Sequence, residues 1–252
     1  MTHDLARRLG AELLGTAMLV VVGTGSVVAA LTFGDGELDY AGLGFVSLAF
    51  AVVVAVVIYG FGPVSGAHIN PAVTLSLAAT RRFPWGEVLP YVLAQLVGAT
   101  LGSLVVVGTF GTGAVDLGLG GTSLGDGVPQ WQGMVAEAVG TYVLLFTVMA
   151  LAVDSRAPLG WAGLMIGLAV AAAILVIAPL TGGSLNPART FGPLLVLTLF
   201  GGDAAWSQLG VYVVGPVVGG LLAVVSYDLL AQTRTPQASA EESYTPAAGE
   251  EG

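Results

Sequence analysis

Six long apolar segments constrain this chain more than any other feature of its sequence. They cover residues 9–32, 41–62, 88–108, 132–153, 160–178 and 208–231. Each is long enough to cross a lipid bilayer as a helix, which takes about 20 residues. Apolar residues make up 55% of the chain and charged residues only 9%, whereas a typical soluble domain is about 25% charged. The sequence therefore predicts an all-α membrane protein with six transmembrane helices.

Two further apolar segments are too short to cross a bilayer, and both begin with Asn-Pro-Ala. The boxes are Asn70, Pro71 and Ala72 in SGAHINPAVT, and Asn186, Pro187 and Ala188 in TGGSLNPARTFGP. Asn is a favoured N-cap and Pro is favoured at the first helical position, so each box predicts the start of a short helix. Gly and Ser precede each box and permit irregular backbone. One such box alone would indicate only a capped helix, but paired broken segments in two halves of a membrane protein indicate a binding site or pore.

The chain also repeats itself. AELLGT at 11–16 recurs as AEAVGT at 136–141, and AQLVGA at 94–99 is echoed by GPVVGG at 215–220. The inverted repeats predicted from this match are residues 9–108 and 131–231. Each half has an odd number of spans, so the second half is inserted upside down relative to the first. We therefore expect the two half-helices to enter the membrane from opposite faces and to meet near its midplane.

Basic and acidic residues predict the orientation of the chain. The basic residues outside the membrane all fall on one predicted face: Arg7, Arg8, Arg81, Arg82, Arg156 and Arg234. The loops of the other face carry only acids: Asp35, Glu37, Asp39, Asp116, Asp126 and Asp203. Because arginine in short loops stays in the cytoplasm, we expect a multi-pass protein of the cell membrane with both termini cytoplasmic.

The remaining basic residue of the spanning region, Arg189, lies in the first turn of the second short helix. A cation there opposes the helix dipole, which favours a functional role over a snorkelling or ion-paired arginine. Two helix N-termini that face one another create a positive zone at the membrane centre, which repels cations and hydronium. Asn70 and Asn186 cap with their amide oxygens, so we expect their NH2 groups to face the lumen. Arg189 would add hydrogen bonds to a solute oxygen and repel cations.

With these boxes the chain resembles the aquaporin and aquaglyceroporin family, the major intrinsic proteins, over residues from about 9 to 231. The resemblance implies six helices and two half-helices in an inverted 3+3 repeat, a single channel domain over 1–231, and a homotetramer with one pore per protomer. The composition of residues 232–252 predicts a disordered cytoplasmic tail.

Three further polar residues are candidates for a role at the pore loops. Glu12 and Glu137 are repeat-equivalent acids inside spans, where an ionisable group is costly unless it has a role. By resemblance they brace the loops before the boxes by accepting backbone donors. A coupling carboxylate of a proton-driven transporter is the alternative. His68 either lines the pore or satisfies loop backbone.

The family narrows its pore at four positions that can be carried over from the boxes. These selectivity-filter candidates are Phe50, Ile174, Gly183 and Arg189. Water-specific members usually have His at the second position and a small polar residue or Cys at the third. Glycerol-conducting members usually have a second aromatic residue in the filter and Asp after the arginine, where this chain has Thr190. The sequence fits neither subgroup.

Composition excludes several other kinds of site. The chain has no Cys and only two histidines, which excludes thiolate metal sites and Cys nucleophiles and does not favour a histidine metal site. The net charge of −9 comes largely from the tail and loops, without the basic patches of a nucleic-acid binder. We find no nucleophile paired with a base, so we expect neither an enzyme nor a bound cofactor. The Gly-rich loop at 109–130 either shapes a vestibule or is a linker, and we favour the linker.

The sequence thus predicts a passive channel for water and other small uncharged solutes that excludes protons and ions. One alternative is a facilitator selective for glycerol, urea or metalloid hydroxides, with little water specificity. Rivals from other classes are a gradient-coupled secondary transporter and a membrane protein with a purely structural role.

Overall fold

The computed structural model describes residues 3–231, and all of their regular structure is helical. Six helices are long and apolar enough to cross a membrane, and each agrees with a predicted span to within a few residues. They are α1 (Leu5–Phe33), α2 (Tyr40–Ser65), α4 (Trp85–Phe110), α6 (Gln130–Val148, continued by the π-helical turn Met149–Val153), α7 (Ala162–Thr181) and α9 (Leu209–Ala231). The predicted all-α fold with six spans is confirmed. The predicted disordered tail at 232–252 lies outside the described residues.

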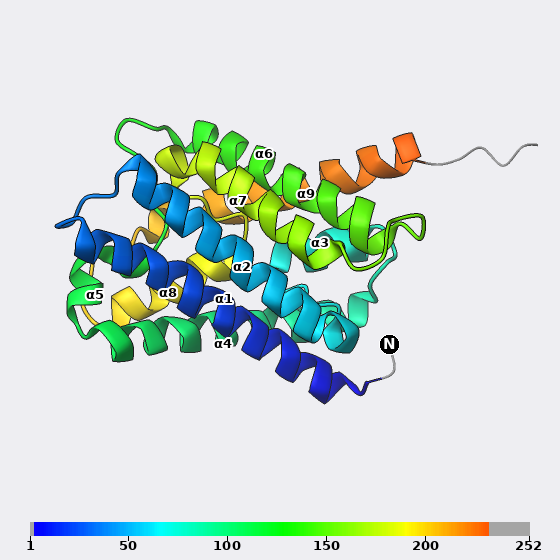
Figure 1. Cartoon of the computed structure of the whole chain (residues 1–252), viewed down its shortest axis with the longest axis horizontal. Coiled ribbons are helices and arrows are strands. Elements are labelled where there is room, and N and C mark those ends of the chain that lie inside the picture. Colours follow the sequence, from blue (N-terminus) through cyan, green and yellow to red (C-terminus); the bar gives the residue numbers. More distant parts are fainter. Residues whose placement is uncertain (1–2, 232–252) are drawn as a thin grey trace, which may run out of the picture.

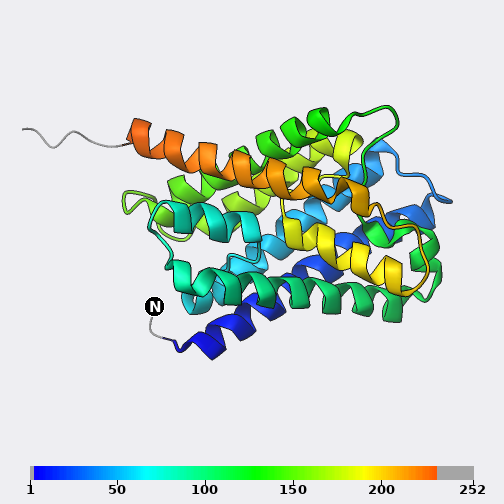
Figure 2. The same cartoon turned by 180° about the vertical axis from the view of Figure 1, so that it is seen from behind.

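Two short helices, α3 (Pro71–Ala79) and α8 (Pro187–Leu199), begin at the prolines of the two boxes. The asparagine before each proline has extended backbone, and its side-chain oxygen accepts a hydrogen bond from a backbone N–H of the first turn. The helices have 9 and 13 residues, or roughly 14 and 20 Å, so neither crosses a bilayer alone. Helix α3 lies toward the end that holds the N-terminus, and α8 lies toward the other end (Figures 1 and 2).

The chain leaves the preceding long helix in the same way in both halves. Helix α2 is followed by Gly66 with φ of 90°, and α7 is followed by Gly182 with φ of 73°. Both values lie in the left-handed region, which glycine adopts at little cost. Each long helix therefore ends at a left-handed glycine and gives way to an irregular loop that runs to the box.

Two glycines let the outer helices cross closely, one in each half. A Cβ placed on Gly98 of α4 would collide with the carbonyl oxygen of Leu13 in α1. A Cβ on Gly219 of α9 would collide in the same way with the carbonyl oxygen of Ala138 in α6. Small residues at such crossings let helix backbones approach one another in a membrane. A glycine therefore permits close packing of α1 with α4 in the first half and of α6 with α9 in the second.

The long connection between the halves is packed against the protein, so the interpretation as a linker is wrong. It contains the short helix α5 (Gly113–Asp116) and the 3-10 turn η1 (Gly118–Gly120). Leu119 is fully buried, and Gly125 N donates a hydrogen bond of 2.9 Å to the carbonyl oxygen of Leu180 in α7. A second 3-10 turn, η3 (Trp206–Gln208), leads into α9 at the same end of the molecule.

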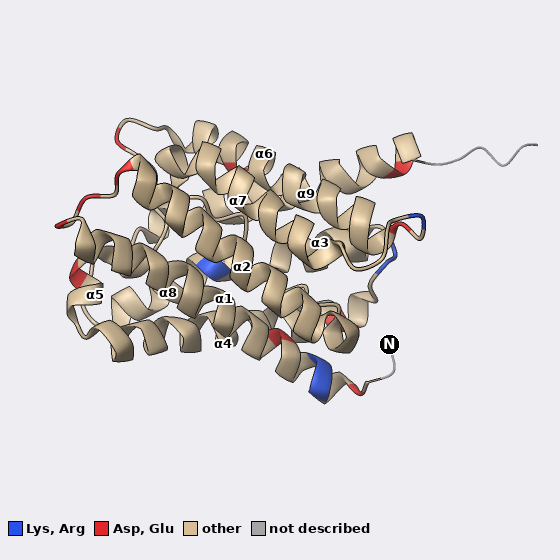
Figure 3. Cartoon of the chain, viewed as in Figure 1, with Lys and Arg blue, Asp and Glu red and all other residues tan. Residues whose placement is uncertain are grey.

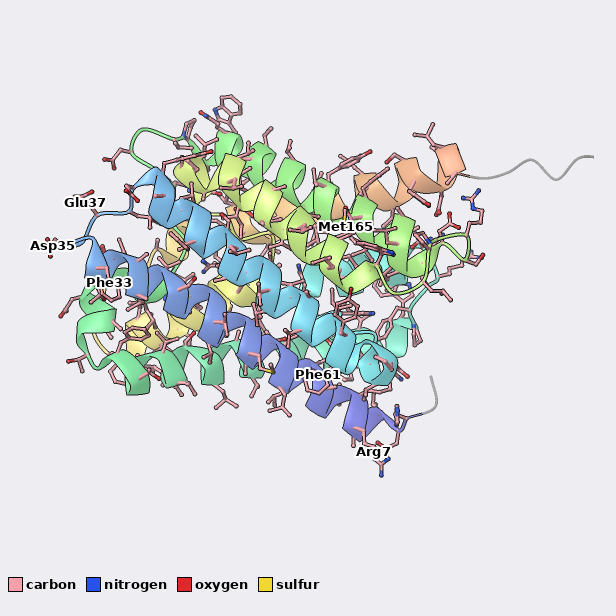
Figure 4. The ribbon with its side chains drawn as sticks, in the orientation of Figure 1. Arg7, Phe33, Asp35, Glu37, Phe61 and Met165 are labelled. Atoms are coloured by element: carbon pink, nitrogen blue, oxygen red, sulfur yellow. The ribbon has the colours of Figure 1, made fainter. Side chains whose placement is uncertain are left out.

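Charge separates the two ends of the molecule. Apart from one basic segment on α8, in the middle, the blue segments of Figure 3 gather at the end where the N-terminus and the end of α9 lie. Arg7 and the Asp35–Glu37 loop lie at opposite ends in Figure 4. Acids at the basic end are engaged in ion pairs, including Arg8 with Glu87 and Arg82 with Asp228.

Candidate functional site

The two boxes meet at the centre of the molecule and are joined by a crossed pair of hydrogen bonds. The Nδ2 of Asn70 donates to the carbonyl oxygen of Leu185 at 2.9 Å, and the Nδ2 of Asn186 donates to the carbonyl oxygen of Ile69 at 2.8 Å. The N-termini of α3 and α8 therefore face each other, as the inverted repeat predicts. The amide NH2 groups are not wholly free for the lumen, because each uses one of its two hydrogens across the junction.

Glu12 of α1 is fully buried beneath the first loop and accepts four hydrogen bonds. Two come from backbone, His68 N at 2.9 Å and Ile69 N at 2.6 Å. The others come from Ser65 Oγ at 2.7 Å and Gln95 Nε2 at 2.8 Å. A carboxylate offers about four acceptor positions, so this group is saturated by the protein.

Glu137 of α6 has the same relation to the second loop. Its carboxylate accepts from Ser184 N at 2.9 Å, Leu185 N at 2.7 Å and Thr181 Oγ1 at 2.7 Å. The residues just before the boxes, Ile69 with φ of 44° and Leu185 with φ of 56°, are both left-handed. That conformation is costly for a side chain with a Cβ, above all for a β-branched one, and it persists only where the surroundings hold it.

Two cavities lie one after the other along the molecule and share part of their lining. The inner cavity, of about 220 Å³, extends toward the basic end, and Asn70, Asn186 and His68 line it together with many aliphatic side chains. The outer cavity, of about 350 Å³, opens at the acidic end. Phe50 and Arg189 line both, so the narrow segment between the cavities lies at these two side chains.

Arg189 is 2% exposed and held by backbone rather than by an acid. Its Nη1 donates to the carbonyl oxygen of Gly120 at 2.8 Å, and its Cζ lies 5.3 Å from the centroid of the Phe50 ring. Its Nε is sealed without a partner, whereas its Nη2 has no protein partner and is not sealed, and within residues 3–231 the side chain forms no ion pair. The guanidinium therefore keeps donors beside the narrow segment. The Gly118–Gly120 turn was missed from sequence, because it belongs to the loop interpreted as a linker.

The other two filter candidates lie next to each other. Ile174 lines the outer cavity, but at the third position it is Gly182, rather than Gly183, that contributes to the wall. Gly183 has φ of 64°, and a Cβ there would lie 3.4 Å from Cγ1 of Ile174. The structure thus brings together Phe50, Ile174 and Arg189, with Gly183 leaving room behind Ile174.

Both interpretations of His68 find support in the contacts it makes. Its ring lines the inner cavity, while its backbone N–H is bonded to Glu12. The ring packs edge-on against Phe83, with centroids 4.8 Å apart, and lies 5.4 Å from the Tyr91 ring. Its Nδ1 lies 3.1 Å from Thr74 Oγ1.

A sequence model of the Major intrinsic protein family matches residues 1–227. The chain belongs to this family. Aquaporin AqpM of Methanothermobacter marburgensis is 44% identical over 241 residues, which cover 90% of this chain and 98% of the relative. Aquaporin Z of Bradyrhizobium diazoefficiens is 40% identical over 236 residues, covering 91% and 95%. The solved aquaglyceroporin of Plasmodium falciparum superposes with a TM-score of 0.77 at 25% identity, covering 90% of this chain and 97% of that one.

The predicted membership of the major intrinsic proteins is confirmed, and this family consists of channels rather than enzymes. The spanning helices and the family together make the chain a multi-pass membrane protein. Among residues 3–231 no group of three potential metal ligands occurs.

Two tyrosines that hold the loops of this major intrinsic protein were missed from the sequence. Tyr91 donates to the carbonyl oxygen of Ser65, and Tyr212 donates to that of Thr181, each at 2.9 Å. Ser65 and Thr181 are the last residues of α2 and α7. The signal was available, because the repeat extends three residues further back as YVLAQLVGA and YVVGPVVGG.

Proposed function

We propose that the protein is a passive channel for water and other small uncharged solutes that excludes protons and other ions. The observation that carries this proposal is the crossed hydrogen bonding of Asn70 and Asn186 at the wall of the inner cavity, with Arg189 at the narrow segment between the two cavities. The relatives are named aquaporins and the solved neighbour is named an aquaglyceroporin, which supports both water and small organic solutes.

Proton exclusion follows from the direction of the donors at the junction. Each half-helix places about half a positive charge at its N-terminus, and the two ends face each other. The second hydrogen of each Asn amide is not used across the junction, and both side chains line the inner cavity. A water held there by its oxygen points its hydrogens away on both sides, which interrupts a proton-relaying chain.

The two buried carboxylates act as braces of the pore loops rather than as coupling groups. Glu12 and Glu137 hold the left-handed residues Ile69 and Leu185, whose carbonyl oxygens receive the Asn amides. A gradient-coupled transporter needs a carboxylate that exchanges its ligand. Glu12 is already saturated by four protein donors, which argues against coupling.

A specific observation favours conduction of solutes larger than water. Phe50 at the narrow segment and Ile174 in the outer cavity present an apolar wall, while Nη2 of Arg189 has no protein partner and is not sealed from the cavities. A polyol or urea would place its carbon skeleton on that wall and its oxygen on the guanidinium. Polyols, urea and metalloid hydroxides are therefore the second candidate solutes.

We further propose a homotetramer in the cell membrane, with one pore in each protomer and both termini in the cytoplasm. The channel domain spans residues 1–231. The orientation is supported by the gathering of arginines at the end that holds both ends of the described chain (Figure 3). The proposal of a tetramer is supported by the family resemblance alone.

The test is a stopped-flow panel on purified protein in liposomes, with water, glycerol and urea as permeants. We expect water flux well above that of empty liposomes, without dependence on an ion gradient. Uptake that requires a sodium or proton gradient would instead assign the protein to the transporters. Flux at the empty-liposome level, with correctly inserted protein, would indicate a structural role.

A further inference from the structure

Three polar contacts converge on one hydroxyl beside the inner cavity. Thr74 Oγ1 lies 3.1 Å from Gln95 Nε2, 3.1 Å from His68 Nδ1 and 3.1 Å from the carbonyl oxygen of Asn70. A hydroxyl has one hydrogen to donate and two lone pairs to accept with. The three neighbours therefore determine one another's hydrogen positions.

Gln95 enters this cluster as a donor. Its Nε2 also donates to Glu12 Oε2 at 2.8 Å, and Glu12 is saturated by donors, as an ionised carboxylate should be. The opposite amide orientation would place the Gln95 oxygen against a carboxylate oxygen. The second Nε2 hydrogen of Gln95 therefore occupies one lone pair of Thr74 Oγ1.

The hydroxyl hydrogen of Thr74 then has two possible destinations. If it pointed at His68 Nδ1, Oγ1 would face the carbonyl oxygen of Asn70 as one acceptor against another. If it points at that carbonyl oxygen, the second lone pair remains for a hydrogen on Nδ1, and all three contacts become hydrogen bonds. Buried polar groups favour the fully paired arrangement.

We propose that His68 carries its hydrogen on Nδ1 and presents the lone pair of Nε2 to the inner cavity, with Thr74 and Gln95 as positioning residues that set this tautomer. The ring lines the cavity, and Nε2 has no protein partner yet is not among the sealed polar atoms of the described chain. Gly66 leaves this edge open, since a Cβ there would lie 3.2 Å from Nε2.

This inference rests on the proposed function and narrows its solute class. Asn70 offers a donor to the inner cavity, while His68 Nε2 offers an acceptor to the same cavity. A molecule that passes both groups without losing hydrogen bonds must itself accept and donate. Water, alcohols and amides satisfy this requirement, whereas a neutral solute without a donor hydrogen leaves Nε2 unpaired and pays for its desolvation.

The chain makes the tautomer directly measurable, because it contains only two histidines. A His3→Ala protein labelled with 15N-histidine, reconstituted in lipid, reports His68 alone by magic-angle-spinning NMR. We expect an N–H coupling on Nδ1 and the shift of an unprotonated nitrogen on Nε2. A hydrogen on Nε2 in this protein would overturn the assignment.

Three variants in the same background test the positioning residues. We expect Thr74→Val to move the hydrogen from Nδ1 to Nε2 and to lower water permeability roughly three- to tenfold, the size expected for one lost hydrogen bond. Thr74→Ser keeps the hydroxyl and should keep both tautomer and flux. The control is Thr80→Val, because the Thr80 hydroxyl bonds only to backbone within α3 and its own capping turn.

An unchanged tautomer in folded Thr74→Val would refute the role of this hydroxyl. Gln95→Leu provides an independent reading, and we expect a mixture of tautomers in it. Should Gln95→Leu fail to fold, the valine and serine variants still decide the matter. A Nδ1–H tautomer in a wild-type protein that conducts no water would leave this assignment standing while removing the proposed function.

Discussion

The two halves of the molecule hold their half-helices in place with the same kinds of hydrogen-bonding groups. They differ in the side chains that lie in the first turn of each half-helix. Glu12 and Glu137 accept from the loops, Tyr91 and Tyr212 donate to the ends of α2 and α7, and the asparagines cross. Three residues after the capping asparagines, however, the first half has Val73 and the second has Arg189.

A second difference lies on the outer helices. Gln95 of α4 donates to Glu12, whereas the repeat-equivalent residue of α9 is Pro216, which has no side-chain donor. In the first half Arg8 is buried against Glu87 and Tyr91. The shared residues thus build the frame, and the unshared residues make the two sides of the junction chemically unequal. On the function proposed above, we expect selectivity to depend on the residues that differ between the two halves.

The largest expected effect comes from removing a shared brace. Glu12→Ala leaves three buried N–H donors without that acceptor and Glu137→Ala leaves two, because the Ser65 and Thr181 hydroxyls also reach backbone carbonyl oxygens. Each unpaired buried donor costs about 1–3 kcal/mol, so both variants should lose at least about 2 kcal/mol, Glu12→Ala more than Glu137→Ala. Thermal unfolding in detergent measures this, with exposed Glu37→Ala as control. Equal stability of Glu12→Ala and wild type would remove the bracing role.

Arg189→Val makes the second half-helix match the first. We expect proton or cation leak to rise roughly tenfold or more, because a unit charge about 4 Å from an ion contributes several kcal/mol at an effective dielectric constant near 20. Proton flux into dye-loaded liposomes measures the leak, and exposed Arg7→Val is the control. If folded Arg189→Val protein shows the same proton and cation leak as wild type, ion exclusion would be assigned to the half-helix N-termini alone.

A smaller effect is expected at the apolar wall. Ile174→His should lower the glycerol-to-water permeability ratio about two- to fivefold, since a polar wall favours water over a carbon skeleton. Ile174→Val keeps the wall apolar and should keep the ratio. Gly183→Thr is a poor test, because φ of 64° is strained for a β-branched residue. Unchanged ratios at matched incorporation would place solute discrimination elsewhere.

The smallest effect concerns mercurials. We expect them not to inhibit water permeability by reacting with a thiol. The chain contains no Cys in either half, so neither side of the junction can form such an adduct. Water permeability before and after mercurial treatment is the measurement. Block that is reversed by added thiol would contradict this expectation.

The spans and half-helices were predictable because their signals are local. Length and apolarity mark the six long helices, and the Asn-Pro pair marks both the start of α3 and the start of α8. The sequence also placed Phe50 and Ile174, but only through their distance from the boxes of the family, whereas Arg189 could be singled out as a cation in the first turn of a short helix.

The partners of these residues were not predictable, because they are chosen by tertiary packing. Nothing in the sequence around Gln95 distinguishes a residue that faces Glu12 from one that faces lipid. The Gly120 carbonyl oxygen reaches Arg189 from 69 positions away, out of a Gly-rich loop that shows no helical or strand periodicity. Leu119 in this loop has a left-handed backbone with φ of 53°. The composition of the loop does not predict this conformation.

The crossed asparagine bonds also bear on how the protein is made. They join residues 115 and 117 positions apart. The ribosome must therefore add more than half of the second repeat before Asn70 and Ile69 can form these hydrogen bonds. At about 5–20 residues per second this takes roughly 6–23 s. During that time the Ile69 carbonyl oxygen cannot accept its hydrogen bond from Asn186. Water, lipid headgroups or the insertion machinery must supply a donor instead. The crossed junction can therefore be completed only late in synthesis, and a nascent chain stopped before Asn186 cannot complete it.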